Sequence, residues 1–364
     1  MVWQKLTGRK KSAASTALVS VIIPVFNAAA HLRGALESLA AQQHELFEVL
    51  CVDDGSTDGS QDIVREFAGP DPRFRLLEPG KLGAGGARNF GFAQAQGEFT
   101  VFLDADDVFH PELLSLTTAE LVRSGADICV YGGAAFPGAE SGSLPAGGAV
   151  SEPKMSYLAA GALPEKLPFR PRDVAERIFE LATPAPWLRL YRTEFLRDRG
   201  LEFQQVARSN DLAFTMTSMA VAAKISALPR PLVHYRTGHG SNLQANLHAS
   251  PLDFVEALRG LRDNLEHHGV LGDFRPAFQN LCVNTVVHNL RKTTTVAAYV
   301  EVYNFARDTL LAEFGLDTMT EDDFFRREDF LEISQVKTIP AEQSLLESRT
   351  QRRELWRLRG DLKK

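Results

Sequence analysis

The chain of 364 residues has only three cysteines, and nowhere does it have the run of about eighteen apolar residues that a bilayer span needs. Cys51, Cys129 and Cys282 lie far apart in apolar surroundings, so we expect buried thiols in a reducing compartment rather than disulfides or a zinc site. The sequence predicts no transmembrane helix. The basic N-terminus lacks the apolar core of a signal peptide, and we therefore expect a cytoplasmic protein.

Positive charge is also in deficit, because the formal net charge is −6 and the pI is about 5.9. This balance gives no general electrostatic attraction to nucleic acid. The hydrophobic fraction of 44% and the charged fraction of 24% are those of a globular protein. The length predicts two or three domains, or one large domain with an extension.

Short apolar segments alternate with helical patterns through the first part of the chain. A near-continuous apolar run such as LVSVIIPVF, residues 18–26, is typical of a strand buried on both faces of a parallel sheet. The alternation predicts βαβ units, and hence an α/β fold with a mainly parallel, twisted sheet flanked by helices. The other expected strands span residues 46–52, 73–77, 99–103 and 127–131, and the expected helices span 31–42, 83–96 and 111–124, with one more ending near 67.

Composition divides the chain into three expected parts. Residues 1–17 form a polar leader, and 18–245 form the α/β domain. Within that domain, residues 132–171 are rich in Gly, Ala, Pro and Ser, which predicts a loop or mobile insertion near the site. Residues 246–364 form a helical C-terminal region, with helices expected at 251–267, 274–292, 297–314 and 341–364.

The charged tail, residues 341–364, is expected to form the last helix of that region. Its apolar side chains can pack on its own domain, contact a partner helix or touch a membrane surface. Basic residues around Trp356 are the reason to consider peripheral membrane association. The apolar side chains of this helix are Leu345, Leu346, Leu355, Trp356 and Leu358.

Three carboxylates follow the apolar strand 99–103, at Asp104, Asp106 and Asp107. Such a cluster is costly unless something neutralises it. Mg²⁺ and Mn²⁺ prefer oxygen ligands and keep positions open for substrate phosphates, and ligands bind at the carboxyl ends of strands in open α/β sheets. We therefore expect a divalent metal here. The alternative is that Asp106 or Asp107 caps the helix that starts near Pro111.

Asp53 and Asp54 end the second strand, where a carboxylate can bind a nucleoside. The alternative is turn chemistry, which Asp-Gly sequences favour. Further along, the Gly-rich segment 83–86 opens a helix and could present N–H groups to phosphate, together with Arg88 and Asn89. Its likeness to a dinucleotide fingerprint is weak.

Four motifs now stand in order along the chain: VSVIIPVFN, VDDGSTDGS, ARNFGFAQAQGEF and VFLDADD. At these intervals they resemble the inverting glycosyltransferases of family 2, which have the GT-A fold. The resemblance is strong over Leu18 to Tyr131, continues more weakly to about residue 245 and leaves the helical C-terminal region uncovered.

The resemblance implies a binding site for the donor nucleotide. Pro24, Phe26 and Asn27 match the motif that ends the first strand, where the ring contacts the base. Asp54 matches the carboxylate that binds the base, with Asp53 beside it. The implied base is uracil.

The resemblance also implies the reacting groups. Asp104 and Asp106 match the outer pair of the family's Asp-x-Asp motif, which touches the ribose side and the metal, and Asp106 is the foremost candidate ligand. Asp211 matches the catalytic base, while Asn210 replaces the Glu that usually precedes it. The alternative is that Asp211 is the N-cap of the following helix. A base beside a solvated cleft can work as an ordinary carboxylate, so no unusual pKa is expected.

A looser match places Arg236, His239 and Ser241 in a flexible segment near the donor phosphates. Histidines there fit loop or packing positions better than ligand positions. Trp187 fits a core position better than a sugar platform.

Together these features predict a metal-dependent enzyme that moves a sugar from a nucleotide sugar, expected to be a UDP-sugar, to a hydroxyl of a saccharide or lipid-linked acceptor. The resemblance implies a role in bacterial surface polysaccharide synthesis. Two alternatives stay open: an inactive nucleotide-binding scaffold, suggested by Asn210, and a sugar nucleotidyltransferase, which would share the metal and the nucleotide.

Overall fold

The structure is a computed structural model, and it describes residues 16–137, 158–237 and 250–347. The described residues fall into two compact units. The first lies within Met1–Gly240 and Arg259–Phe274, and the second within Ser241–Leu258 and Arg275–Lys364. Most of the predicted leader, residues 138–157 of the predicted insertion and most of the predicted C-terminal tail lie outside the described residues.

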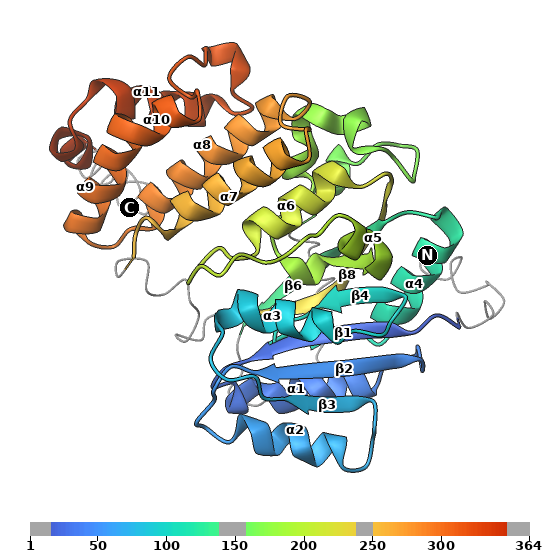
Figure 1. The fold of residues 1–364 in the computed structure, drawn as a ribbon. Coiled ribbons are helices and arrows are strands. Elements are labelled where there is room, and N and C mark those ends of the chain that lie inside the picture. The colour runs from blue at the N-terminus through green and yellow to red at the C-terminus, as the bar shows by residue number, and fades with distance from the viewer. Residues whose placement is uncertain (1–15, 138–157, 238–249, 348–364) are drawn as a thin grey trace, which may run out of the picture. The chain divides into compact units, whose positions relative to one another are not determined.

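The first unit is built on one eight-stranded sheet (Figure 1). Its order is β3-β2-β1-β4-β7-β6-β8-β5, and β1, β2, β3 and β4 run parallel. β7 is antiparallel to both its neighbours, and the short β5 is antiparallel to β8. The strands are β1 (Val19–Val25), β2 (Phe47–Asp53), β3 (Phe74–Leu77), β4 (Phe99–Phe102), β5 (Val108–Phe109), β6 (Ile128–Pro137), β7 (Arg189–Arg192) and β8 (Ile225–Thr237).

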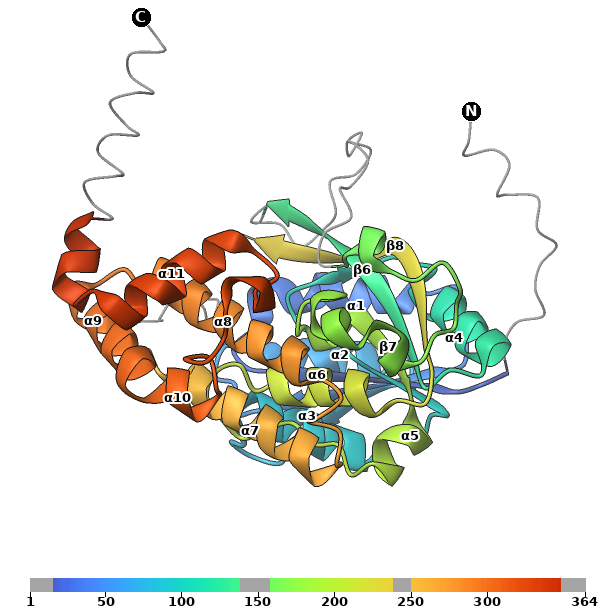
Figure 2. The same ribbon diagram turned by 90° about the horizontal axis from the view of Figure 1, so that it is seen from above.

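Helices cover both faces of the parallel part of this sheet. α1 and α3 lie on opposite faces (Figure 1 and Figure 2), as right-handed crossovers require when the chain turns back across β1 to reach β4. α3 lies close against the sheet, because a Cβ at Gly91 would come within 2.7 Å of Ile22 Cγ2. The helices of this unit are α1 (Ala29–Ala40), α2 (Ser60–Ala68), α3 (Gly83–Ala93), α4 (Leu113–Ser124), α5 (Thr193–Asp198) and α6 (Leu212–Val221).

The sequence-based prediction was wrong about where one strand ends. The composition changes at Gly132, but β6 continues to Pro137, paired in parallel with β8 and with register shifts around Gly132. Two glycines inside a paired strand weaken the sequence signal for it. The segment Pro171–Glu180 forms a kinked 3₁₀ helix, with non-helical φ and ψ at Val174.

The second unit is helical, as predicted. Its buried side chains include Cys282, Val286 and Ile333, and Tyr303 Oη donates to the carbonyl oxygens of Gln335 (2.8 Å) and Ile339 (2.9 Å). α7 (Asp253–His267) crosses the boundary of the two units, and the other helices are α8 (Arg275–Lys292), α9 (Val296–Phe305), α10 (Leu311–Glu313) and α11 (Arg327–Thr338). A π-helical turn, Ala306–Leu310, joins α9 to α10. α11 was not predicted from the sequence. None of the helices in the described ranges combines the length and apolarity that a bilayer crossing demands.

Candidate active site

The carboxyl ends of β1, β2 and β4 meet at one edge of the sheet. Val25 pairs with Asp53 across β1 and β2, and the Leu103 N–H donates to the Ile22 carbonyl at 3.0 Å. The residues that follow these strands therefore emerge side by side. They include the predicted nucleotide-binding and metal-binding side chains, as the sequence led us to expect for a parallel sheet.

The end of β1 presents an exposed aromatic ring. Phe26 is 52% exposed, the Lys81 ammonium lies 5.7 Å from its ring centroid, and Pro24 is half-buried in the strand before it. Asn27 has φ +48°, and its Oδ1 accepts a hydrogen bond from the Thr57 N–H at 2.8 Å. Asn27 thereby fixes the turn after β1, and Phe26 is the side chain left available to a ligand.

The two acids that end β2 have different roles. Asp53 accepts hydrogen bonds from the backbone N–H groups of Gly55 and Ser56 and from Gln61 Nε2, so its carboxylate is used by the turn itself. This is the alternative that the sequence left open for the pair. Asp54 accepts from the N–H of Gly83 at 2.8 Å and from that of Leu82, both through Oδ1.

Asp54 thus holds the start of α3, where Gly83 has φ +75°. A carboxylate at a helix N-terminus is stabilised by the helix dipole. Within the described residues, its Oδ2 has no protein partner. That oxygen remains available to accept a hydrogen bond from a base.

The three acids after β4 repel one another in a partly buried position. Burial raises the pKa of Asp104; Arg88 opposes this, and the charge of Asp106 adds to it. Burial, Asp106 and Asp104 together raise the pKa of Asp107 well above its usual range. None of the three caps α4, whose N-cap is Glu112. The capping alternative therefore does not account for the cluster.

Asp107 is fully buried and connects two segments of the sheet. Its Oδ1 accepts the backbone N–H of Arg236 at 3.0 Å, while its Oδ2 has no hydrogen-bond partner. Arg236 is also buried, and its Nε donates to the Asp106 carbonyl at 2.9 Å. The predicted donor-binding Arg236 thus holds the acidic loop in place. His239 and Ser241 lie outside the described residues.

The acidic cluster fits a divalent cation of the Mg²⁺ or Mn²⁺ type. Mutual repulsion and the unpartnered Oδ2 of Asp107 leave the cluster short of positive charge. Over the described residues, no three His, Cys, Asp or Glu side chains are placed to hold a metal by themselves. Mg²⁺ is usually bound by one or two carboxylates, with phosphates and water completing its shell. Asp104 and Asp106 can supply that pair.

Arg88 joins the acidic loop to the segment before α6. It is 7% exposed; its Nη2 donates to Asp104 Oδ1 at 2.8 Å and its Nη1 to Asn210 Oδ1 at 2.9 Å. Its guanidinium also lies 5.3 Å from the ring centroid of Phe203. Arg88 and Asp104 therefore meet, and Asn210 joins them.

Asn89 fixes the same segment rather than facing a ligand. Its Nδ2 donates to the Phe203 carbonyl, its Oδ1 accepts the Phe203 N–H, and both distances are 2.8 Å. Gly85 allows the close approach, because a Cβ there would lie 2.2 Å from the Gln204 carbonyl oxygen. Both polar atoms of the Asn89 amide thus help to position the chain that leads to Asn210.

Asp211 is at the N-cap position of α6, but its side chain makes no capping hydrogen bond. Burial raises its pKa to about 6; Arg88 lowers it, Asp104 raises it, and Arg189 lowers it. The expectation of an ordinary carboxylate was wrong, because the partial burial of Asp211 raises its pKa. A carboxylate with a pKa near 6 is suited to proton transfer near neutral pH.

A family model described as glycosyl transferase family 2 matches residues 20–200. The chain belongs to glycosyltransferase family 2. Among its relatives, the putative glycosyltransferase EpsH of Bacillus subtilis is 30% identical over 63% of this chain and 63% of its own length. The poly(ribitol-phosphate) beta-N-acetylglucosaminyltransferase TarS of Staphylococcus aureus is 29% identical over 66% of this chain. The match covers only 39% of TarS.

This family 2 chain has the GT-A fold. The crystal structure of S. aureus TarS 1–349 in complex with UDP-GlcNAc matches it with a TM-score of 0.62 and 23% identity, covering 81% of each chain. That identity supports the fold alone. The mixed sheet with flanking helices agrees with the architecture that the sequence predicted.

Two buried charged residues at this edge of the sheet were not predicted from the sequence. Asp107 was noted only as part of an acidic run, and its buried contact with Arg236 depends on a pairing of distant strands. Arg189 lies in a short apolar segment and was passed over, although it is fully buried. A charged residue inside an otherwise apolar segment was the available signal. Trp187 is in the core as expected, stacked 5.4 Å from Tyr235.

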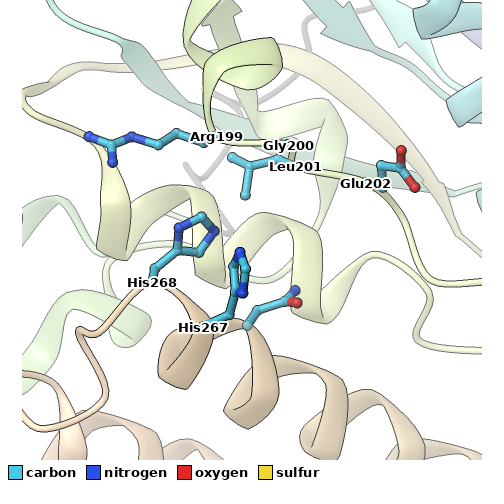
Figure 3. Close-up of a pocket in the computed structure, with 7 residues that line it drawn as sticks. Arg199, Gly200, Leu201, Glu202, His267 and His268 are labelled. Atoms are coloured by element: carbon cyan, nitrogen blue, oxygen red, sulfur yellow. The ribbon is translucent and has the colours of Figure 1, made fainter.

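A separate pocket of about 270 Å³ lies away from these acids (Figure 3). Arg199, Glu202, His267 and His268 are among the residues that line it. Arg199 is the C-cap of α5, where its positive charge complements the negative end of that helix, and His267 ends α7. The pocket contains none of the predicted catalytic or metal-binding residues.

Proposed function

We propose that this protein is an inverting, metal-dependent glycosyltransferase that uses a nucleotide-sugar donor. The observation that carries the proposal is the meeting of Asp104, Arg88 and Asn210 at the edge where Asp106 and Asp211 also lie. A pair of carboxylates suited to a metal is thereby close to an unpaired carboxylate suited to a base. Transfer of a sugar from a diphosphate to a hydroxyl needs these two functions together.

The roles follow from the contacts. Phe26 and Asp54 Oδ2 would bind the base, and Asp104 and Asp106 would hold the cation, which supplies neutralisation of the charge on the leaving diphosphate. Asp211 would accept the proton of the acceptor hydroxyl, whose oxygen bonds to the anomeric carbon as the bond to the diphosphate breaks. Attack from the face opposite the leaving group inverts that carbon.

The relatives support a choice of substrates to test first. TarS is a poly(ribitol-phosphate) beta-N-acetylglucosaminyltransferase, and its crystal structure was solved with UDP-GlcNAc. We therefore propose a UDP-sugar as donor and a bacterial surface polymer, or a lipid-linked saccharide, as acceptor. The predicted GT-A domain, residues 18–245, would bind the donor.

The first test is a thermal-shift screen of nucleoside diphosphates and nucleotide sugars, each with and without Mn²⁺. A ligand that binds only the folded protein raises its stability by mass action. A metal-dependent shift with UDP, followed by turnover with one UDP-sugar and an inverted product, is the expected result. Binding without turnover would favour the scaffold alternative, and pyrophosphate release from a nucleoside triphosphate with a sugar phosphate would favour the nucleotidyltransferase.

A further inference from the structure

One face of α3 holds the chain that leads to Asp211. Gly85, Arg88 and Asn89 are spaced i, i+3 and i+4, so they lie on the same side of that helix. Asn89 Nδ2 donates to the Phe203 carbonyl at 2.8 Å, and Asn89 Oδ1 accepts the Phe203 N–H at the same distance. The Asn89 amide therefore fixes both backbone polar groups of Phe203 at once.

Phe203 is also anchored through its ring. The residue is 3% exposed, and its ring stacks on that of Phe214 with the centroids 3.9 Å apart. The ring of Phe102 at the end of β4 meets it edge-on at 4.8 Å. The backbone of Phe203 is thus held by α3 and its side chain by the core, which makes it a fixed point from which the following chain starts.

Both ends of the loop before Asp211 rest on Gly85. A Cβ at Gly85 would lie 2.2 Å from the Gln204 carbonyl oxygen and 3.4 Å from Asn210 Cβ. The loop therefore leaves α3 and returns to it. Residues 205–209 between the two ends are half-buried or exposed. The ends of the loop, more than its middle, set the path of the chain into Asp211.

The return of the loop is determined locally by Ser209. This non-glycine residue has φ +56°, a sparsely populated conformation that persists only where the surrounding structure imposes it. The Ser209 carbonyl accepts the Leu212 N–H at 3.1 Å, where α6 begins. The backbone at Asp211 is therefore fixed from two directions, by the loop ends on α3 and by the first turn of α6.

We propose that Asn89 is a positioning residue, which fixes Phe203 and thereby holds Asp211 in its place beside Arg88 and Asp104. The inference rests on the proposed function, in which Asp211 is the base. A base must lie within hydrogen-bond reach of the proton it takes, and a misplacement of about 1 Å can cost about a hundredfold in rate. Asn89 then serves the chemical step and not donor binding, the role that the sequence suggested for it.

The test compares Asn89→Ala with Asn280→Ala. Asn280 of the second unit is a matched control, because its Nδ2 donates to the Asp323 carbonyl and its Oδ1 accepts the Phe325 N–H, both at 2.9 Å. We expect kcat to fall about tenfold to a hundredfold in Asn89→Ala, while the affinity for UDP with Mn²⁺ stays within about twofold of the wild type. Asn280→Ala should lower the Tm and keep the wild-type kcat.

A wild-type kcat in Asn89→Ala would overturn the proposal. A loss of UDP affinity that accounts for the lost activity would also overturn it, because Asn89 would then be a donor contact. If Asn89→Ala does not fold, Asn89→Gln replaces it in the test, since it keeps the amide on a longer side chain. A wild-type protein that turns over no UDP-sugar would contradict the proposed function and, with it, the catalytic meaning of this inference.

Hydrogen exchange gives a measurement that needs no turnover. The Phe203 N–H is protected by Asn89 Oδ1, so Asn89→Ala should speed exchange at Phe203 and across residues 204–211. In Asn280→Ala the faster exchange should occur at Phe325 instead. Unchanged exchange over residues 203–211 in Asn89→Ala would show that the core alone holds Phe203, and would overturn the proposal whether or not the protein is active.

Discussion

Arg88 Nη1 lies 2.9 Å from Asn210 Oδ1, and the same guanidinium lies 2.8 Å from Asp104. An amide at position 210 takes this hydrogen bond without adding a negative charge. The positive charge of Arg88 therefore remains available to Asp104 and to Asp211. The resemblance to family 2 implied a Glu at this position. Asn210, which replaces it, still accepts the hydrogen bond of Arg88, because this bond needs only a neutral oxygen.

Arg88→Lys should lower kcat/KM by about tenfold to a hundredfold while the protein still folds. A lysine ammonium is a compact point charge and cannot reproduce the two-armed contact of a guanidinium. Steady-state kinetics with the identified donor would measure the effect. Arg65→Lys is the control, because Arg65 makes exposed ion pairs with Asp62 and Glu78, which contribute little. Equal activity of the two variants would show that the Arg88 contacts are dispensable.

Asp211→Asn should abolish turnover and leave UDP binding in place, because the amide cannot accept the proton. In the wild type, turnover should fall as the pH drops through about 6, where Asp211 becomes protonated. The measurement is a pH profile of kcat/KM together with a thermal shift with UDP. Turnover that persists in Asp211→Asn would move the base to another residue.

The stability of the protein should also depend on the ionisation of Asp211, but with the opposite pH dependence: acid lowers turnover and raises the contribution of Asp211 to stability. The pKa of Asp211 in the folded protein, about 6, lies above the value of about 3.9 in an unfolded chain. Protonation therefore favours the folded state, and the stabilising contribution is full below pH 4 and lost as the pH rises through 6. We expect Asp211→Asn to melt above the wild type at pH 7.5 and together with it at pH 4.

Asp106→Ala should remove the Mn²⁺-dependent part of the thermal shift with UDP. The variant deletes one of the two carboxylates proposed to hold the cation. Asp322→Ala is the matched control, since Asp322 is an exposed acid in the second unit. A shift in Asp106→Ala as large as in the wild type would place the cation elsewhere or make it unnecessary.

Gly85→Ala should destabilise the protein by about 1–3 kcal/mol and reduce turnover. The new Cβ would lie 2.2 Å from the Gln204 carbonyl oxygen, and backbone cannot move aside cheaply. Gly272→Ala is the control, because a Cβ there meets nothing within 4 Å. Denaturant unfolding would measure both. An equal, small change in the two variants would show that the segment after Phe203 adapts freely.

Much of this site could be predicted because it follows the ends of strands. The apolar runs before Asn27, Asp54 and Asp104 predict strands, and parallel strands bring their carboxyl ends together. Neither the order of the strands nor their register was needed to infer that these residues would meet. The same alternation predicted the α/β sheet, and the resemblance carried by the motifs implied the GT-A fold.

What could not be predicted depends on packing between distant segments. The raised pKa of Asp211 comes from burial and from three charges on other elements, none of which is near it in the sequence. The two hydrogen bonds between the Asn89 amide and the Phe203 backbone form only because the chain around Phe203 lies over α3. Likewise, β6 runs beyond Gly132 because β8 offers it a partner there.

Asp104 and Asp211 repel each other, so the ionisation of Asp211 depends on whether a cation is bound at Asp104 in the proposed site. A cation that arrives at Asp104 cancels part of the negative charge that opposes ionisation of Asp211. By thermodynamic reciprocity, an ionised Asp211 must strengthen cation binding by the same factor. If the cation binds at Asp104 as proposed, cation binding and ionisation of Asp211 would favour each other, and Asp211 would be less fully ionised in the empty site.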